Sequence, residues 1–165
     1  MPKFYGKYRG KVVQNVDPDS LGRVLVNVPS VMGAAQDWAM PAAPFAGIQA
    51  GIYAVPPPAA NVWVEFEEGD SQRPIWSGGF WDKGTVPAMA LVPPAPVPHV
   101  LIQTVGQNTL HITDGPSPPL AAGGILLKSG ASTIAIGPDG VKITAPKIEV
   151  LGATIVNNGA LAVTL

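Results

Sequence analysis

A short strand-and-turn repeat in the last third of the chain restricts the folds open to it. Pairs of aliphatic residues, two positions apart, recur every seven to nine residues, with glycine or asparagine in the intervals. A two-residue period places both members of a pair on one face of a β-strand. A fixed period of strand plus turn is typical of β-solenoids and β-prisms. The pairs are Ile125/Leu127, Ile134/Ile136, Val141/Ile143 and Ile148/Val150, with weaker echoes at Ile155 and at Leu161/Val163/Leu165.

These strands predict an oligomer, because each is about five residues long and offers one narrow apolar face. No helical period follows to cover that face. A single copy would leave an aliphatic strip and unpaired strand edges in water, which is an aggregation hazard. Three copies wound around a threefold axis would turn the strips inward and pair the edges. We therefore predict an obligate homotrimer in which residues 99–165 form an intertwined β-helix, with the four aliphatic pairs of 125–150 as its core.

Residues 61–81 carry the clearest strand signal of the N-terminal half. Val62, Val64 and Phe66 alternate with more polar neighbours, as in a strand with one buried face, and residues 68–70 break the pattern as a turn does. A second arm over 74–81 completes a hairpin that would close a small barrel. Three of the four tryptophans lie in this hairpin, so much of the N-terminal core is expected there.

The remaining segments predict an all-β chain in two parts. Five short strands without helical periodicity indicate a five-stranded OB-fold barrel over residues 1–84. Five prolines between Pro87 and Pro98 make residues 85–98 an extended connector. Residues 99–165 then begin with a hairpin of 100–105 and 109–113. The barrel strands are expected at 4–16, 23–28, 47–55, 61–67 and 74–81, with a loop over 30–45.

Composition excludes several classes of protein. The chain has no cysteine, so it forms neither a disulfide framework nor a thiolate metal site. Its net charge of −1, with 13% charged residues, provides neither a nucleic-acid footprint nor a basic membrane patch. No apolar run approaches the ~18 residues of a membrane-spanning helix, and no signal peptide is recognised at the N-terminus.

The acidic residues offer two candidate sites, and both are better explained otherwise. Glu65 and Glu67 share a strand face about 7 Å apart, but no sugar cleft accompanies them, so a solvated face is preferred over a glycosidase pair. The same holds for Glu68 and Asp70. Asp17-x-Asp19 resembles the start of a calcium loop, yet Val28 stands where a bidentate glutamate is needed, so turn chemistry is preferred.

The two histidines leave one question open. In a trimer, any inward-facing histidine is triplicated, so His99 or His111 could hold a metal or an anion on the axis. Only Asp114 is a nearby second ligand, and a surface or connector position is the simpler interpretation. Whether a metal sits there is not decided by sequence. No Ser-His-Asp arrangement or phosphate loop is supported, so we predict no catalytic, cofactor or metal site and no enzyme.

The aromatic residues of the barrel raise the alternative of a nucleic-acid binder. Trp63, Trp76, Phe80 and Trp81 could stack on the bases of a single strand. Because no basic groove accompanies them, a core role is expected for most of them.

Taken in order, the motifs resemble the central spike family of contractile injection machines. This family includes phage baseplate spikes, the VgrG proteins of type VI secretion and the spikes of extracellular injection systems. The resemblance covers nearly the whole chain and implies an OB-fold collar followed by a trimeric β-helix at the membrane-proximal end of a tail tube. The matching segments are Gly10-Lys-Val-Val, Asp17-Pro with Leu21-Gly-Arg-Val-Leu-Val-Asn-Val-Pro29, Trp38-Ala-Met-Pro41, Val62–Asp70, Pro74-Ile-Trp76 and the repeat from Ile125.

The chain departs from the family in ways that shape the expected partners. The barrel is expected to begin near residue 4 without a hub region, the connector 85–98 is too short for a lysozyme domain, and residues 159–165 contain no His-x-His iron motif. The resemblance therefore implies a separate trimeric hub protein, and a PAAR-like tip protein docked on Leu161, Val163 and Leu165. No cofactor and no nucleic acid are expected.

The expected role is a structural spike that connects hub to tip and pierces the target envelope on contraction. The expected location is a virion baseplate or extracellular injection particle assembled in the bacterial cytoplasm. The alternative is a trimeric tail-fibre or carbohydrate-binding adhesin domain. The absence of Trp, Tyr and Phe from residues 99–165 counts against that alternative. Phage, tailocin and extracellular injection system stay equally open.

Overall fold

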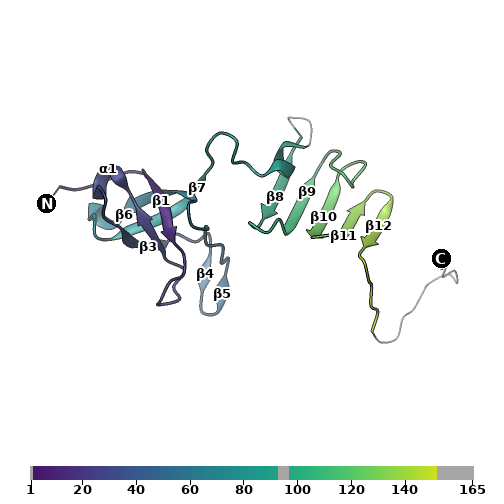
Figure 1. The fold of residues 1–165 in the computed structure, drawn as a ribbon, viewed down its shortest axis with the longest axis horizontal. Helices are drawn as coiled ribbons and strands as arrows, with labels where there is room; N and C mark the ends of the chain where they lie inside the picture. The colour runs from purple at the N-terminus through teal and green to yellow at the C-terminus, as the bar shows by residue number, and fades with distance from the viewer. Residues whose placement is uncertain (1, 93–96, 152–165) are drawn as a thin grey trace. The chain divides into compact units, whose positions relative to one another are not determined.

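The computed structural model describes residues 2–92 and 97–151, which divide into two compact units (Figure 1). The first unit ends at Val86 and the second begins at Pro87. Strands dominate both, and helical turns are few and short: α1 (Pro29–Met32), η1 (Glu67–Gly69) and η2 (Ala88–Leu91). No helix among the described residues has the length and apolar character needed to cross a membrane.

The first unit is a closed five-stranded barrel of the OB type, as the sequence predicted. Its strands follow one another around the barrel in the order β1-β2-β3-β7-β6. All neighbours are antiparallel except β3 and β7, which run parallel. Full closure leaves the barrel without a free sheet edge. The strands are β1 (Tyr8–Gln14), β2 (Val24–Asn27), β3 (Asp37–Pro41), β6 (Asn61–Phe66) and β7 (Pro74–Phe80).

The third barrel strand lies elsewhere than the sequence analysis placed it. It is β3, inside the segment 30–45 that was expected to be a loop. The segment 47–55 instead takes part in a small separate hairpin of β4 (Ala46–Gly47) and β5 (Ala50–Gly51). Gln49 and Gly51 both have positive φ, at 52° and 156°, so the backbone turns sharply where a continuous strand was predicted.

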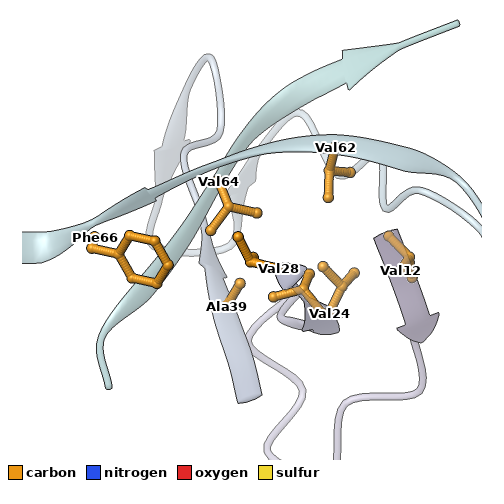
Figure 2. Packing of buried hydrophobic residues seen from close by; sticks show 8 residues of the cluster. Val12, Val24, Val28, Ala39, Val62, Val64 and Phe66 are labelled. Carbon is orange, nitrogen blue, oxygen red and sulfur yellow. The ribbon is translucent and has the colours of Figure 1, made fainter. Parts of the chain in front are cut away.

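The barrel core is built mainly from valines (Figure 2). On β1, β2 and β6, buried residues alternate with more exposed ones. β-branched side chains of this size suit the narrow interior of a small barrel. The alternation predicted for β6 is confirmed, because Val62, Val64 and Phe66 all point inward. The buried residues are Val12, Val24, Val26, Val28, Ala39, Val62, Val64 and Phe66.

The hairpin does contribute Val62, Val64 and Phe66 to the core, but the expectation that most of its outer aromatic residues lie there is wrong. Among the three tryptophans of the hairpin over 61–81, only Trp76 packs against the buried cluster. Trp81 is 66% exposed. Trp63 alternates with the inward valines of β6 and therefore faces outward.

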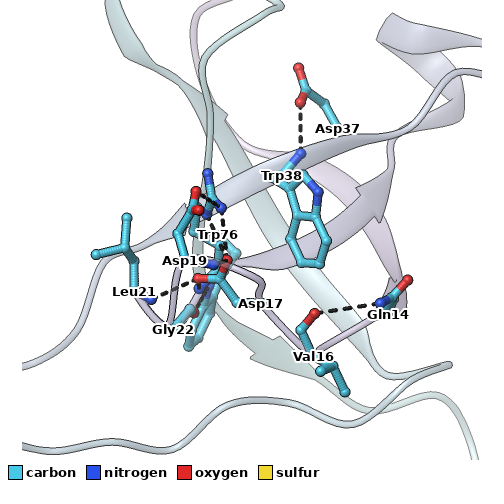
Figure 3. Close-up of polar contacts among 10 residues, drawn as sticks. Gln14, Val16, Asp17, Asp19, Leu21, Gly22, Asp37, Trp38 and Trp76 are labelled. Atoms are coloured by element: carbon cyan, nitrogen blue, oxygen red, sulfur yellow. Dashed lines mark hydrogen bonds and ion pairs between the residues drawn. The ribbon is translucent and has the colours of Figure 1, made fainter.

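The turn between β1 and β2 is held by one carboxylate (Figure 3). Asp17 accepts hydrogen bonds from the backbone amides of Asp19, Leu21 and Arg23, at 3.0, 2.8 and 3.1 Å. It also accepts one from the Arg23 guanidinium at 2.7 Å. That guanidinium, followed by the three amides, holds the pKa of Asp17 well below its usual range even though partial burial opposes the shift. Turn chemistry, rather than a calcium loop, is what these residues form.

The second unit is an antiparallel meander of five strands. Each strand pairs with the next along the same chain, in the order β8-β9-β10-β11-β12. The predicted hairpin of 100–105 and 109–113 is confirmed as β8 and β9. The winding of three chains around each other stays a prediction, as does the limit of the connector at 85–98. The strands are β8 (His99–Gln103), β9 (Thr109–Thr113), β10 (Gly124–Ser129), β11 (Ser132–Gly137) and β12 (Gly140–Thr144).

Candidate trimerisation surface

The strand register of the second unit aligns aliphatic residues across the whole sheet. Directly opposed pairs such as Ile125 and Ile136, or Leu127 and Ile134, continue from strand to strand without a shift. Because alternate residues share a face, the two resulting rows lie on the same side of the sheet. We call this side the aliphatic face. One row is Val100, Ile112, Ile125, Ile136 and Val141, and the other is Ile102, Leu110, Leu127, Ile134 and Ile143.

The aliphatic face lies open in the single chain. Nine of its ten residues are between 37% and 63% exposed, and Leu110 is half-buried. The row that contains Leu110 and Ile134 borders an open apolar hollow of about 590 Å³, to which the segment 145–148 also contributes. A continuous patch of this kind on a soluble protein marks an interaction surface or an aggregation hazard.

The structure brings together most of the predicted core residues. Ile125, Leu127, Ile134, Ile136, Val141 and Ile143 all lie on the aliphatic face. Ile148 and Val150 follow β12 and are exposed. Leu161, Val163 and Leu165, the predicted tip-docking residues, lie outside the described residues.

Sequence reasoning missed four residues of the face, those contributed by β8 and β9. Their signal was present, because they show the same two-residue alternation as the later strands. They were assigned to a hairpin and not to the repeat, since their spacing is less regular. The four are Val100, Ile102, Leu110 and Ile112.

The opposite face of the same sheet has a cover of its own. Leu126 and Ala135 are buried there together with Leu120, and Met89 of η2 packs against this cluster. The loop between β9 and β10 folds back so that Ser117 and Leu120 pair through a β-bridge. The two faces of the sheet therefore differ. One face packs against a small hydrophobic cluster of the same chain, whereas no comparable cluster covers the aliphatic face among the described residues.

Both histidines belong to the covered face. His111 is buried, its Nδ1 lies 3.4 Å from the Ser117 hydroxyl oxygen, and its Nε2 has no partner among the described residues. The His99 ring lies 5.5 Å away, edge to face. Burial, and then the nearby His99, lower the pKa of His111. Neither imidazole lies on the aliphatic face, and no group of three or more His, Cys, Asp or Glu side chains gathers in the described part of the chain.

The barrel carboxylates lie on a solvated face. Glu65 pairs with Lys7 at 3.1 Å, and hydrogen bonds from Lys7 and then Ser77 lower the pKa of Glu65. Glu67 pairs with Arg73 at 2.7 Å. Each carboxylate thus has a basic neighbour, which is the interpretation preferred from sequence.

The outward aromatic residues of the barrel stack on an arginine. Arg9 lies over the rings of Trp63 and Phe80, 5.1 and 4.6 Å from their centres, and the two rings are 4.7 Å apart. This arrangement stabilises the outer surface of β1, β6 and β7. The guanidinium covers one face of each ring, so that face is not open to a nucleic-acid base.

Comparison with known protein families matches each unit separately. Residues 8–81 match the type VI secretion system/phage-baseplate injector OB domain. Residues 99–162 match the phage baseplate V C-terminal trimerisation domain. The chain belongs to the baseplate spike family of contractile injection machines. No curated protein matches the sequence.

This family membership gives the spike protein its broad role. Both matched families are structural baseplate components, and they indicate a spike in a phage baseplate or a type VI system. The trimerisation domain supports a homotrimer. Such a spike is part of a virion or a comparable particle.

Proposed function

We propose that the spike protein is a non-enzymatic connector that joins a trimeric hub at the tube end to a tip protein and enters the target envelope on contraction. The observation that carries this proposal is the aliphatic face, whose ten residues form two unbroken rows across five strands. An exposed aliphatic face of this size needs another apolar surface to cover it. In the proposal, the partners are two further copies of the chain.

The proposed trimer core extends the set predicted from sequence. It consists of the ten residues of the aliphatic face together with Ile148 and Val150, which follow β12. Burial of an aliphatic side chain contributes about 1.5–3 kcal/mol when it is complete. Twelve such residues per chain give the assembly a continuous dry interior, and no chemistry of side chains is needed for stiffness.

The strand length of the sheet favours three copies. A strand of five residues spans about 17 Å, and the centre of an equilateral triangle with that side lies about 5 Å from each edge. Packed sheets stand about 10 Å apart, so about 5 Å is also the depth of one layer of side chains. Three sheets with their aliphatic faces inward therefore fill a triangular prism without leaving a channel.

The barrel supplies the attachment to the hub in this proposal. It is closed, so it offers neighbours a surface of side chains and no free edge for strand addition. The tip protein is of the PAAR-like class, and Leu161, Val163 and Leu165 are the residues proposed to receive it. Residues 87–165 contain no Trp, Tyr or Phe, which argues against carbohydrate binding by the second unit.

Sedimentation of the purified full chain at micromolar concentration tests the proposal. We expect a single species with three times the monomer mass of 17.0 kDa. A folded, soluble monomer at that concentration would refute the trimeric spike. A glycan array, expected to show no binding, separates the spike from an adhesin.

A further inference from the structure

The charged residues of the second unit are distributed unevenly along its strands. Because neighbouring strands run in opposite directions, their ends and turns form two rows, one along each side of the sheet. We call these two rows of strand ends the edges, as distinct from the outermost strands. Asp114 follows the end of β9, and Asp139 lies in the turn between β11 and β12, so both lie at one edge. We call it the acidic edge. Both carboxylates are exposed.

The other edge carries basic residues. Lys128 lies next to the last residue of β10 and pairs across the sheet with Thr109 and Thr133. Lys147 follows the end of β12. Both lysines line the hollow at this end of the strands, together with Asn108 and Ser129. We call this side the basic edge.

These charges have few partners within their own chain. Asp114, Asp139 and Lys128 make no ion pair with any residue in 2–92 or 97–151. Lys147 contacts Glu149, two positions along, and both side chains are exposed. An exposed pair of this kind is worth little, so Lys147 is available for a better-placed carboxylate.

Cyclic symmetry brings the two edges together. In a ring of three copies, each copy meets its neighbours through two different surfaces, so the acidic edge of one sheet faces the basic edge of the next. We infer that these edges pair between neighbouring copies, Asp114 with Lys128 and Asp139 with Lys147, and that the pairing fixes the register of the three chains. This inference rests on the proposed trimer.

In each proposed pair, the acid and the base belong to the same strand or to neighbouring strands of the sheet. Asp114 belongs to the end of β9, and Lys128 lies on β10, one strand further along. Asp139 lies at the turn that opens β12, and Lys147 follows the end of β12. Asp114 and Lys128 are therefore about one strand spacing, ~4.8 Å, apart along the sheet, whereas Asp139 and Lys147 both adjoin β12. The aliphatic rows alone would tolerate a slip by one strand, because successive strands carry similar residues.

Charge reversal in the full chain tests the inference. The variants are Asp139→Lys, Lys147→Asp and the double swap, with Lys142→Asp as control. Lys142 pairs with Ala135 at the centre of β12, away from both strand ends and so from the acidic and basic edges. Urea-induced dissociation of the trimer is followed by light scattering after size exclusion, at low and at high NaCl.

Each single reversal is expected to weaken assembly about ten- to a hundred-fold at low salt, since three exposed pairs change sign together. The double swap should recover most of that loss, the control should match the wild type, and high salt should reduce every difference. A wild-type trimer whose single variants assemble normally, or whose double swap shows the sum of both losses, overturns the edge pairing alone. A monomeric wild type overturns the proposed trimer as well.

Discussion

The two units of the spike protein use the same alternating strand pattern and bury its apolar side in different ways. In the barrel, Val24, Val26 and Val62 are fully buried because the sheet closes on itself. In the second unit, Ile125 and Ile134 occupy the corresponding alternate positions of their strands, yet each is 37% exposed. Closure completes a core within one chain, whereas an open meander of short strands needs other chains. Because the strands of the two units are of similar length, the comparison teaches that closure, more than strand length or hydrophobicity, decides whether a β unit is complete alone.

The largest effect is expected from a charge on the aliphatic face. Ile136→Asp, or Ile143→Asp, should abolish the trimer, because the symmetry would bury three carboxylates in one apolar interior. The matched control is Ile48→Asp on the β4–β5 hairpin, where the isoleucine is 99% exposed. Sedimentation measures both. Soluble Ile136→Asp trimers at the yield of the wild type would show that this face is not the interface.

A smaller effect is expected in the barrel core. Val12→Ala should lower the free energy of unfolding by about 2 kcal/mol, because it removes buried methyl groups and leaves a cavity. Val13→Ala, the next residue and 41% exposed, should cost less than about 0.5 kcal/mol. All four tryptophans lie in the first unit, so tryptophan fluorescence in urea reports the barrel alone.

Tryptophan fluorescence in urea also distinguishes the barrel core, which one chain completes, from the proposed trimer core. The urea midpoint of the barrel should not depend on protein concentration, because its core lies within one chain. A midpoint for Val12→Ala that moves with concentration would mean that the barrel, too, is completed by other copies.

The next largest effect is expected from acidic pH, which should destabilise the second unit before the barrel. His111 is buried, and its pKa lies below the ordinary value of 6.5, so the unfolded chain binds the proton more readily than the folded one. The stability that neutral His111 confers is complete above that value and is lost as the pH falls toward the lowered pKa, by at most about 1.4 kcal/mol per pH unit. Asp17 of the barrel has a lowered pKa, so its contribution is lost only as the pH falls below the ordinary range of aspartate.

Calorimetry between pH 7 and pH 5 should therefore show the second unit losing stability first. A His111→Asn variant should remove most of this dependence. If His111→Asn retains the full pH dependence in this window, another group is responsible.

The sequence was most informative where alternation was undisturbed. β6 could be predicted residue by residue, because Val62, Val64 and Phe66 alternate strictly with outward residues. The aliphatic pairs from Ile125 onward lie on one face for the same reason. The register that aligns them into rows follows from the tight turns at Gly130 and Gly140, both with positive φ.

The errors came from segments in which local composition misled. Pro41 and Pro44 suggested a loop over 30–45, yet Pro41 stands at the last position of β3, where a proline is tolerated, and the next amide, that of Ala42, still donates to the Trp76 carbonyl oxygen. The tryptophans were assigned to the core by their size, but a barrel of five strands has room for valines. The covered face was also unpredictable, because η2 and Leu120 reach the sheet through contacts that no sequence period announces.

The smallest expected effect tests the outer surface of the barrel. Arg9→Met should lower barrel stability by about 0.5–1 kcal/mol, because it removes the cation that lies over the rings of Trp63 and Phe80. Lys11→Met is the matched control: Lys11 is a basic residue two positions along β1 and faces the same side, but among the described residues it makes no cation–π contact with either ring. Fluorescence in urea reports both variants. Equal losses would assign the effect to net charge, and a loss confined to Arg9→Met assigns it to the stack. Because the stack lies within one chain, its contribution should be the same at every protein concentration, unlike that of any residue on the aliphatic face.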